Sequence, residues 1–204
     1  MSQFAAFCTS FFLIFMAEMG DKTQFMTMAL SAKHSSTVVL SGVALGTLVI
    51  SLISVILGQT VGTFLSKFWL NLLAGLAFIA FGLWSLRGDN EEEEGEKAAA
   101  EEEKREANAK PGALRPIIAV ATAFFVAELG DKTMLATIVI AGREHNHFTA
   151  VWLGSTLGLL CSNALGILAG KVLANKLSAQ AMHYLIAAIY IISGGLAIFE
   201  AFKG

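Results

Sequence analysis

Two copies of one acidic motif lie inside apolar stretches of the chain. Their sequences are AEMGDKTQ at residues 17–24 and AELGDKTM at residues 127–134. On a continuous helix, the glutamate and the aspartate of each copy are three residues apart and share a face. Carboxylate oxygens are the ligands that hard divalent cations such as Ca²⁺, Mg²⁺ and Mn²⁺ prefer. The motifs therefore predict a cation site built from four carboxylates, those of Glu18, Asp21, Glu128 and Asp131.

The neutral polar residues of the motifs are further candidate ligands. Thr23 and Thr133 offer hydroxyl groups about one helical turn beyond the glutamates. Gln24 adds an amide in the first copy only, because Met134 stands at the corresponding position of the second copy. The two half-sites are therefore predicted to be unequal.

Glycine and lysine give the motifs two more properties. Gly20 and Gly130 permit either a local break in the helix or a close approach of another helix, and both would free backbone carbonyl groups for an ion. If Lys22 and Lys132 face the same cavity as the carboxylates, four negative and two positive groups leave a net charge of −2. One divalent cation cancels this charge, and so do two protons, so we hypothesise electroneutral exchange of one M²⁺ for two H⁺. In the alternative, each lysine pairs with a glutamate one turn away on its own helix.

The same residues also have a purely structural interpretation, as buried ion pairs that hold helices together. An ionisable side chain inside the hydrocarbon layer is costly, and a buried ion pair stabilises a fold poorly compared with apolar packing. The duplication of such a group therefore favours a functional role. Ser54 and Asn163 are candidate pathway residues near the middle of their segments. Ser and Asn serve equally as hydrogen-bond partners between membrane helices.

The motifs belong to a chain with the composition of an integral membrane protein. Of its 204 residues 55% are hydrophobic, and ten of the sixteen acidic residues fall within residues 88–115. Outside that stretch, six apolar segments approach the ~20 residues that a helix needs to cross a bilayer. Their bounds are 4–31, 38–63, 68–86, 116–142, 148–173 and 182–202. We predict an all-α membrane protein with six transmembrane helices, and no nucleic-acid partner because the basic residues outside the linker form no patch.

The two halves of the chain resemble each other. With an offset of 110, eight of the thirteen positions from Phe15 to Thr27 are identical in the second half. We therefore predict a three-helix repeat over residues 1–87, a linker over 88–115 and a second three-helix repeat over 116–204. Because each repeat has an odd number of helices, the second enters the membrane from the opposite side, which gives two inverted repeats. The symmetry brings both motifs to the bilayer midplane.

The segment between the halves is rich in Glu, Lys and Ala. It is predicted to be a solvated connector, helical or disordered, that stays outside the membrane. Nine basic residues lie on the linker side of the membrane and three on the other side. The positive-inside rule then places the acidic linker in the cytoplasm and both termini outside.

The doubled signature E-x-G-D-[K/R]-[T/S], intact in both copies, resembles that of the Golgi-type calcium/manganese transporter family, whose bacterial members are manganese exporters. The resemblance extends over essentially the whole chain, with an acidic loop between two three-helix repeats. It implies a divalent cation/proton antiporter without a prosthetic group, which transports Mn²⁺ or Ca²⁺ against H⁺. For a compact chain of bacterial type it implies Mn²⁺ efflux across the inner membrane. The ligand roles that it implies fall on Glu18, Asp21, Glu128 and Asp131, with Thr23 and Thr133 as lesser candidates.

Three other functions are compatible with the residues alone. An intramembrane aspartyl protease needs two carboxylates within a few ångströms, but each aspartate here has a glutamate and a lysine beside it. A cation channel needs a continuous pore, whereas inverted repeats with one midplane site fit alternating access better. An exporter of small organic cations stays open, because hard oxygen ligands favour a bare ion without proving it.

Overall fold

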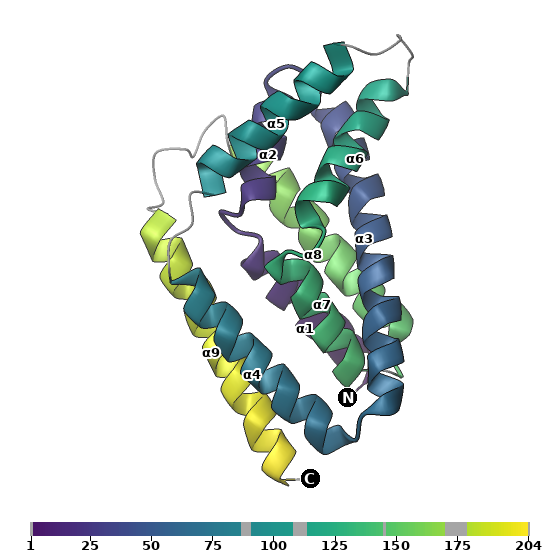
Figure 1. Cartoon of the computed structure of the whole chain (residues 1–204), viewed down its shortest axis with the longest axis vertical. Coiled ribbons are helices and arrows are strands. Elements are labelled where there is room, and N and C mark those ends of the chain that lie inside the picture. Colours follow the sequence, from purple (N-terminus) through teal and green to yellow (C-terminus); the bar gives the residue numbers. More distant parts are fainter. Residues whose placement is uncertain (1, 87–90, 108–113, 145, 170–178, 204) are drawn as a thin grey trace.

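The computed structural model describes residues 2–86, 91–107, 114–144, 146–169 and 179–203. Within these ranges the chain forms nine helices and no strand, as predicted for an all-α protein (Figure 1). The helices are α1 (Gln3–Ala17), α2 (Lys22–Ser31), α3 (Ser36–Phe64), α4 (Lys67–Ser85), α5 (Glu91–Ala107), α6 (Arg115–Glu128), α7 (Lys132–Arg143), α8 (Phe148–Ala169) and α9 (Ala179–Lys203). The ends of the predicted linker and residues 170–173 of the fifth predicted segment lie outside the described residues.

Four helices are each long and apolar enough to cross a membrane, which makes this a multi-pass membrane protein. They are Ser36–Phe64, Lys67–Ser85, Phe148–Leu168 and Tyr184–Lys203. A fifth candidate span is the pair of α1 and α2, which bend by 72° at the break between them. Four of the six predicted spans are thus confirmed as single helices, and the six-span arrangement stays a prediction because the α6–α7 pair is not among the candidates.

The long helices α3 and α8 each pack against the broken helices of the other half of the chain. Helix α3 lies along α6 and α7, and α8 lies along α1 and α2. Glycines make these contacts close: a Cβ at Gly46 would lie 3.0 Å from the carbonyl oxygen of Ala121, and one at Gly154 would lie 2.6 Å from that of Phe7. Small residues of this kind let membrane helices approach until their backbones touch. Each motif-bearing segment is therefore packed closely against one long helix.

Helices α4 and α9, which are far apart in the sequence, pack side by side as a pair next to the rest of the molecule (Figure 1). The two helices meet at Gly75 and Gly194, where a Cβ on either glycine would lie 2.7 Å from the carbonyl oxygen of the other. The buried ring of Tyr190 in α9 stacks on the ring of Phe78 in α4, at a centroid distance of 5.9 Å. This pair contacts the remaining helices at two places: α4 packs against α7, and α9 packs against α1.

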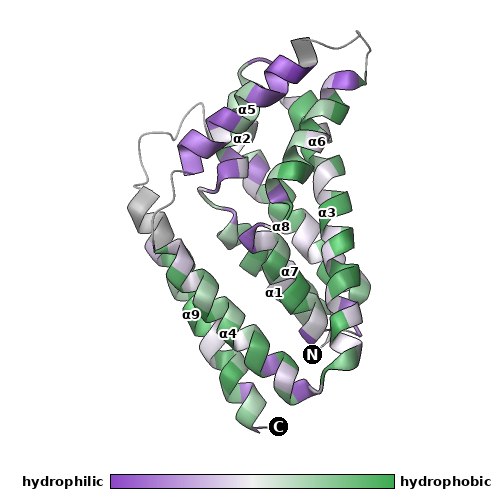
Figure 2. Ribbon diagram, viewed as in Figure 1, coloured by the Kyte–Doolittle hydropathy of each residue, from purple (hydrophilic) through white to green (hydrophobic). Residues whose placement is uncertain are grey.

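The linker helix α5 lies across one end of the bundle, and both termini lie at the other end (Figure 1). Figure 2 shows α5 as the most hydrophilic helix, whereas the helices beneath it are mainly hydrophobic. One face of α5 nevertheless packs along α2 and touches α6, with Ala99 and Glu102 buried. The prediction of a solvated connector is therefore wrong for this face, because the helix presents small side chains to α2 at a helical spacing.

Candidate functional site

Each motif forms a break between two helices rather than a stretch of continuous helix. Gly20 and Gly130 adopt φ angles of 77° and 78°, which side-chain-bearing residues rarely adopt. Glu18 follows the last residue of α1, and Asp21 stands at the N-terminal cap of α2. The expectation that glutamate and aspartate share a face of one helix is therefore wrong, because glycine turns the chain between them. The break prediction is confirmed at both motifs.

Gly130 isolates the effect of this turn, because a Cβ placed there would meet no other atom within 4 Å. We expect Gly130→Ala to destabilise the protein by roughly 1–2 kcal/mol, the cost of left-handed backbone for a residue with a side chain. Thermal unfolding in detergent measures this, with Gly195→Ala as the matched control, since that helical glycine also has open space around its Cβ. Equal melting temperatures for the two variants would show that the turn is not strained by a side chain.

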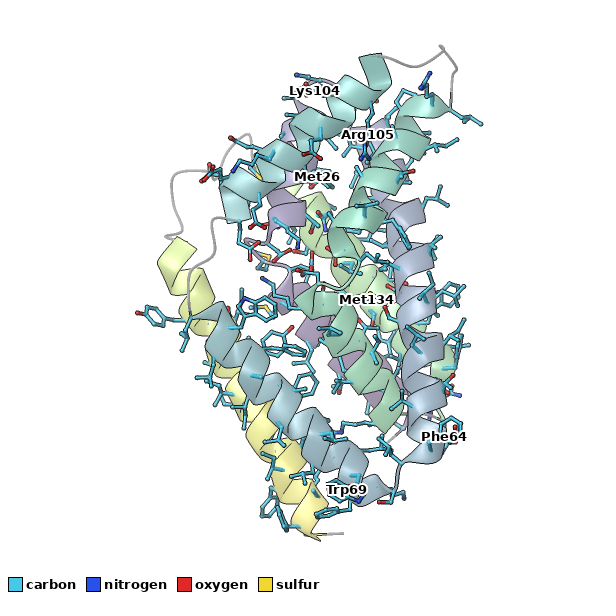
Figure 3. The ribbon with its side chains drawn as sticks, in the orientation of Figure 1. Met26, Phe64, Trp69, Lys104, Arg105 and Met134 are labelled. Carbon is cyan, nitrogen blue, oxygen red and sulfur yellow. The ribbon has the colours of Figure 1, made fainter. Side chains whose placement is uncertain are left out.

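The breaks bring carboxylates of both motifs together in the middle of the molecule. One oxygen from each of Glu18, Asp21 and Glu128 lies within 4.8 Å of the others, and all three residues are at most 1% exposed. One cation with ligand distances of roughly 2.3–2.6 Å spans oxygens at this separation. Figure 3 shows oxygen and nitrogen atoms gathered in this region, between the labelled residues Met26 and Met134.

The motif threonines hold the glutamates in the same way in both copies. The hydroxyl of Thr23 donates to Oε2 of Glu18 at 2.8 Å, and the hydroxyl of Thr133 donates to Oε2 of Glu128 at 2.6 Å. The second oxygen of each glutamate is buried without a hydrogen-bond partner among the described residues, and Oδ2 of Asp21 and Asp131 share this property. Buried carboxylate oxygens normally have a partner. Glu18, Asp21 and Glu128 thus each have an unpartnered oxygen in the three-carboxylate group, whereas Asp131 is not a member of that group.

The lysines pair across the two motifs. Nζ of Lys22 donates to Oδ1 of Asp131 at 2.7 Å, and Nζ of Lys132 forms an ion pair with Oδ1 of Asp21. In the described structure neither lysine pairs with the glutamate of its own motif. The sequence left open whether each lysine pairs with the glutamate of its own helix. In the structure each lysine instead pairs with the aspartate of the opposite half.

Gln24 and Met134 occupy equivalent places beside the two breaks. Oε1 of Gln24 accepts from the backbone N–H of Gly20 at 2.8 Å, and its Nε2 donates to the carbonyl oxygen of Ser162 at 2.8 Å. In the second motif the sulfur of Met134 lies 3.2 Å from the backbone nitrogen of Gly130. Both ends of the Gln24 amide are therefore engaged with the backbone, in a position that supports the break.

The two predicted pathway residues are buried and make hydrogen bonds within the helix bundle. The hydroxyl of Ser54 donates to the carbonyl oxygen of Ile50 at 2.7 Å. Asn163 accepts from the hydroxyl of Thr27 at 3.0 Å, which ties α8 to α2. These bonds place Asn163 next to the first motif, whereas Ser54 bonds only within α3 in the contacts described.

Two residues of this region were not singled out by the sequence. Glu91, the first residue of α5, accepts from the backbone N–H of Lys22 at 3.0 Å and from Nζ of Lys132 at 2.9 Å. In the sequence Glu91 is one of four consecutive glutamates of a polar run. Only its spacing of four residues from Gly95 distinguishes it from the other three. Tyr190 is the second: its hydroxyl is buried and has no hydrogen-bond partner among the described residues.

Comparisons with known proteins show which family the sequence resembles. The family described as "Divalent cation/proton antiporter GDT1" matches residues 6–93 and 116–204. The chain is 33% identical over 182 residues to "GDT1-like protein sll0615" of Synechocystis, which covers 85% of this chain and 86% of that protein. It is 28% identical over 178 residues to a "Putative manganese exporter" of Vibrio cholerae, with 87% and 82% covered. "GDT1-like protein 5" of Arabidopsis thaliana is 28% identical over 215 residues, with 93% and 90% covered. No solved structure matches the chain.

Proposed function

The chain belongs to the GDT1 family of divalent cation/proton antiporters, and from this premise we propose that it exports Mn²⁺ in exchange for protons. The family is one of transporters rather than enzymes, so the aspartyl protease alternative loses its support. The Mn²⁺ assignment takes its support from the Vibrio cholerae relative, which is named a "Putative manganese exporter". Ca²⁺ is the second candidate, since it uses the same oxygen ligands.

The observation that carries the proposal is the set of buried oxygens shared by the two motifs. Glu18, Asp21 and Glu128 supply three oxygens close enough for one ion, and Asp131, which pairs with Lys22, is not one of the three. Thr23 and Thr133 orient the two glutamates instead of binding the ion directly. Such a cluster in a dry protein interior demands either a cation or protons, because unpaired buried carboxylates are costly.

Competition between these two partners is the basis of exchange. A divalent cation at the cluster favours the ionised carboxylates, and protons taken from one side of the membrane displace it. We propose one M²⁺ for two H⁺, in which the ammonium groups of Lys22 and Lys132 remain charged and hold the two aspartates in place.

The arrangement of the protein in the membrane is part of the same proposal. Two inverted repeats over residues 1–87 and 116–204 are supported by the matching breaks, the matching threonine contacts and the crosswise packing of α3 and α8. We place the protein in the bacterial inner membrane with the linker 88–115 in the cytoplasm and both termini outside.

Proteoliposomes that enclose a pH dye test this function. We expect Mn²⁺ uptake into vesicles with an acidic interior, accompanied by loss of internal protons. The initial rate should be unchanged when a K⁺ diffusion potential is imposed with valinomycin, because exchange of one M²⁺ for two H⁺ moves no net charge. Empty liposomes are the control for leakage. Uptake without proton movement would contradict antiport, and a rate that follows the imposed voltage would contradict the two-proton stoichiometry.

A further inference from the structure

The linker helix α5 is fitted to the transport region along one face. The buried positions of this helix are Glu91, Gly95, Ala99 and Glu102. Their spacings of four, four and three residues form a stripe on one side of an α-helix. The intervening glutamates at positions 92–94 are exposed. We call the stripe the docking face, and it packs along α2, directly behind the first motif.

Gly95 brings the backbones of α5 and α2 into contact. A Cβ at this position would lie 2.4 Å from the carbonyl oxygen of Lys22 and 2.8 Å from the backbone nitrogen of Met26. Neither atom can retreat without moving the first turn of α2, which starts at the motif. A side chain at Gly95 therefore separates the two helices without changing any charge.

Glu91 connects the docking face to both motifs. The first N–H groups of a helix have no partner within it, and the N-terminal cap of α2, Asp21, makes no side-chain capping bond. Oε2 of Glu91 accepts from the N–H of Lys22, the first residue of α2, and Oε1 accepts from Nζ of Lys132. One carboxylate of the linker thus binds the backbone of the first motif and the side chain of the second.

We propose that α5 is a gate on the linker side of the transport site, and that Glu91 is the positioning residue that keeps it closed. The gate is coupled to the site through Lys132, which pairs with both Asp21 and Glu91. A divalent cation bound at Asp21 repels this ammonium group, and Glu91 is the acceptor that retains it. A loaded site therefore strengthens the docking of α5, and entry of the ion from the linker side requires α5 to leave. This inference depends on the proposed transport of a divalent cation.

Hydrogen–deuterium exchange of the full chain in detergent tests the docking. We expect Glu91→Gln and Gly95→Val to speed exchange of amides in residues 22–26 and 91–107 by about tenfold or more, since a hydrogen bond to a charged group contributes roughly 1.5–3 kcal/mol. The matched control is Glu94→Gln, which removes an exposed glutamate of the same helix. Exchange in α3 checks that each variant is folded. Wild-type exchange in a folded Glu91→Gln protein would overturn the positioning role.

Added Mn²⁺ tests the coupling in the same experiment. Exchange of residues 91–107 should slow in the wild-type protein and stay unchanged in Glu91→Gln, which keeps the exposed glutamates and so controls for Mn²⁺ held at the helix surface. Equal slowing in both proteins would show adhesion to the helix and overturn the coupling.

A reversible lock tests whether α5 must move. Lys33 of the α2–α3 connection forms an ion pair with Glu103 of α5, so Lys33→Cys and Glu103→Cys can be joined by a short bis-maleimide in a Cys8→Ser, Cys161→Ser background. We expect the cross-linked protein to lose most of its transport and the unlinked double-cysteine protein to keep it. Unchanged transport after complete cross-linking would overturn the gate. If the unlinked protein moves no divalent cation at all, the proposed function fails instead, and the exchange experiment still reports on docking.

Discussion

Glu128→Gln is expected to reduce Mn²⁺ transport by roughly 100-fold or more, and Glu18→Gln to do the same. Each substitution removes one negative charge from the cluster and keeps the size of the side chain. The charge and number of the ligands set cation affinity over several orders of magnitude, and even partners of ligands contribute 10- to 100-fold. Because Thr23 and Thr133 can hydrogen-bond the glutamine oxygen, the local fold should be retained.

The measurement is the initial rate of Mn²⁺ uptake into proteoliposomes with equal amounts of folded protein. Glu94→Gln is the matched control, because the same chemical change is made at an exposed position of α5. Wild-type rates in both motif variants would remove the four-carboxylate site from consideration. Loss of transport in only one of them would show that the two half-sites differ in importance.

Lys132→Gln is expected to destabilise the protein by roughly 3–5 kcal/mol, which is the cost of leaving a buried ionic partner uncompensated. Asp21, the partner of Lys132, is 1% exposed and has no other ion-pair partner among the described residues. The double variant Asp21→Asn, Lys132→Gln removes both charges of this pair, so it should recover part of the stability. Transport should be absent from the double variant, because it lacks the ligand Asp21.

Thermal unfolding in detergent and uptake assays on the same preparations separate these two effects. Residues in one ion-pair network show non-additive stabilities, and here the double variant should melt higher than the Lys132→Gln protein. Lys97→Gln serves as the control, since Lys97 pairs with Glu93 at the surface of α5. A double variant that melts lower than the single variant would show that the pair does not act as a unit.

The sequence predicts much of the fold because membrane helices carry a strong signal. The long apolar runs of α3, α4, α8 and α9 can satisfy their backbone groups in the bilayer only as helices. The break at each motif was also foreseeable, since Gly20 and Gly130 stand between charged residues. The crossed pairing of Lys22 and Lys132 was not, because the residues involved are more than a hundred positions apart and local spacing favours partners on the same helix.

The role of α5 escaped prediction for a different reason. Its composition is that of a solvated helix, with glutamate at most positions. Because charged residues dominate the average composition, the few small residues of the docking face do not stand out. The signal that was available is the placement of Gly95 and Ala99 at four-residue spacings from Glu91. A small side chain in a charged helix indicates where another backbone approaches, and this is a feature to search for in polar linkers between membrane segments.

The crossed lysines also bear on how such a protein could arise. Neither half of the chain is balanced alone, since the cation of each half neutralises the anion of the other. A gene encoding one half could complete this pairing only as a homodimer, in which the lysine of each subunit pairs with the aspartate of the other. Fusion of two such genes inserts a single linker, and α5 with Glu91 can then occupy one side only. Under the proposed inverted arrangement, a symmetric pair of halves would treat both membrane faces alike, whereas the single α5 of this chain makes the two faces different.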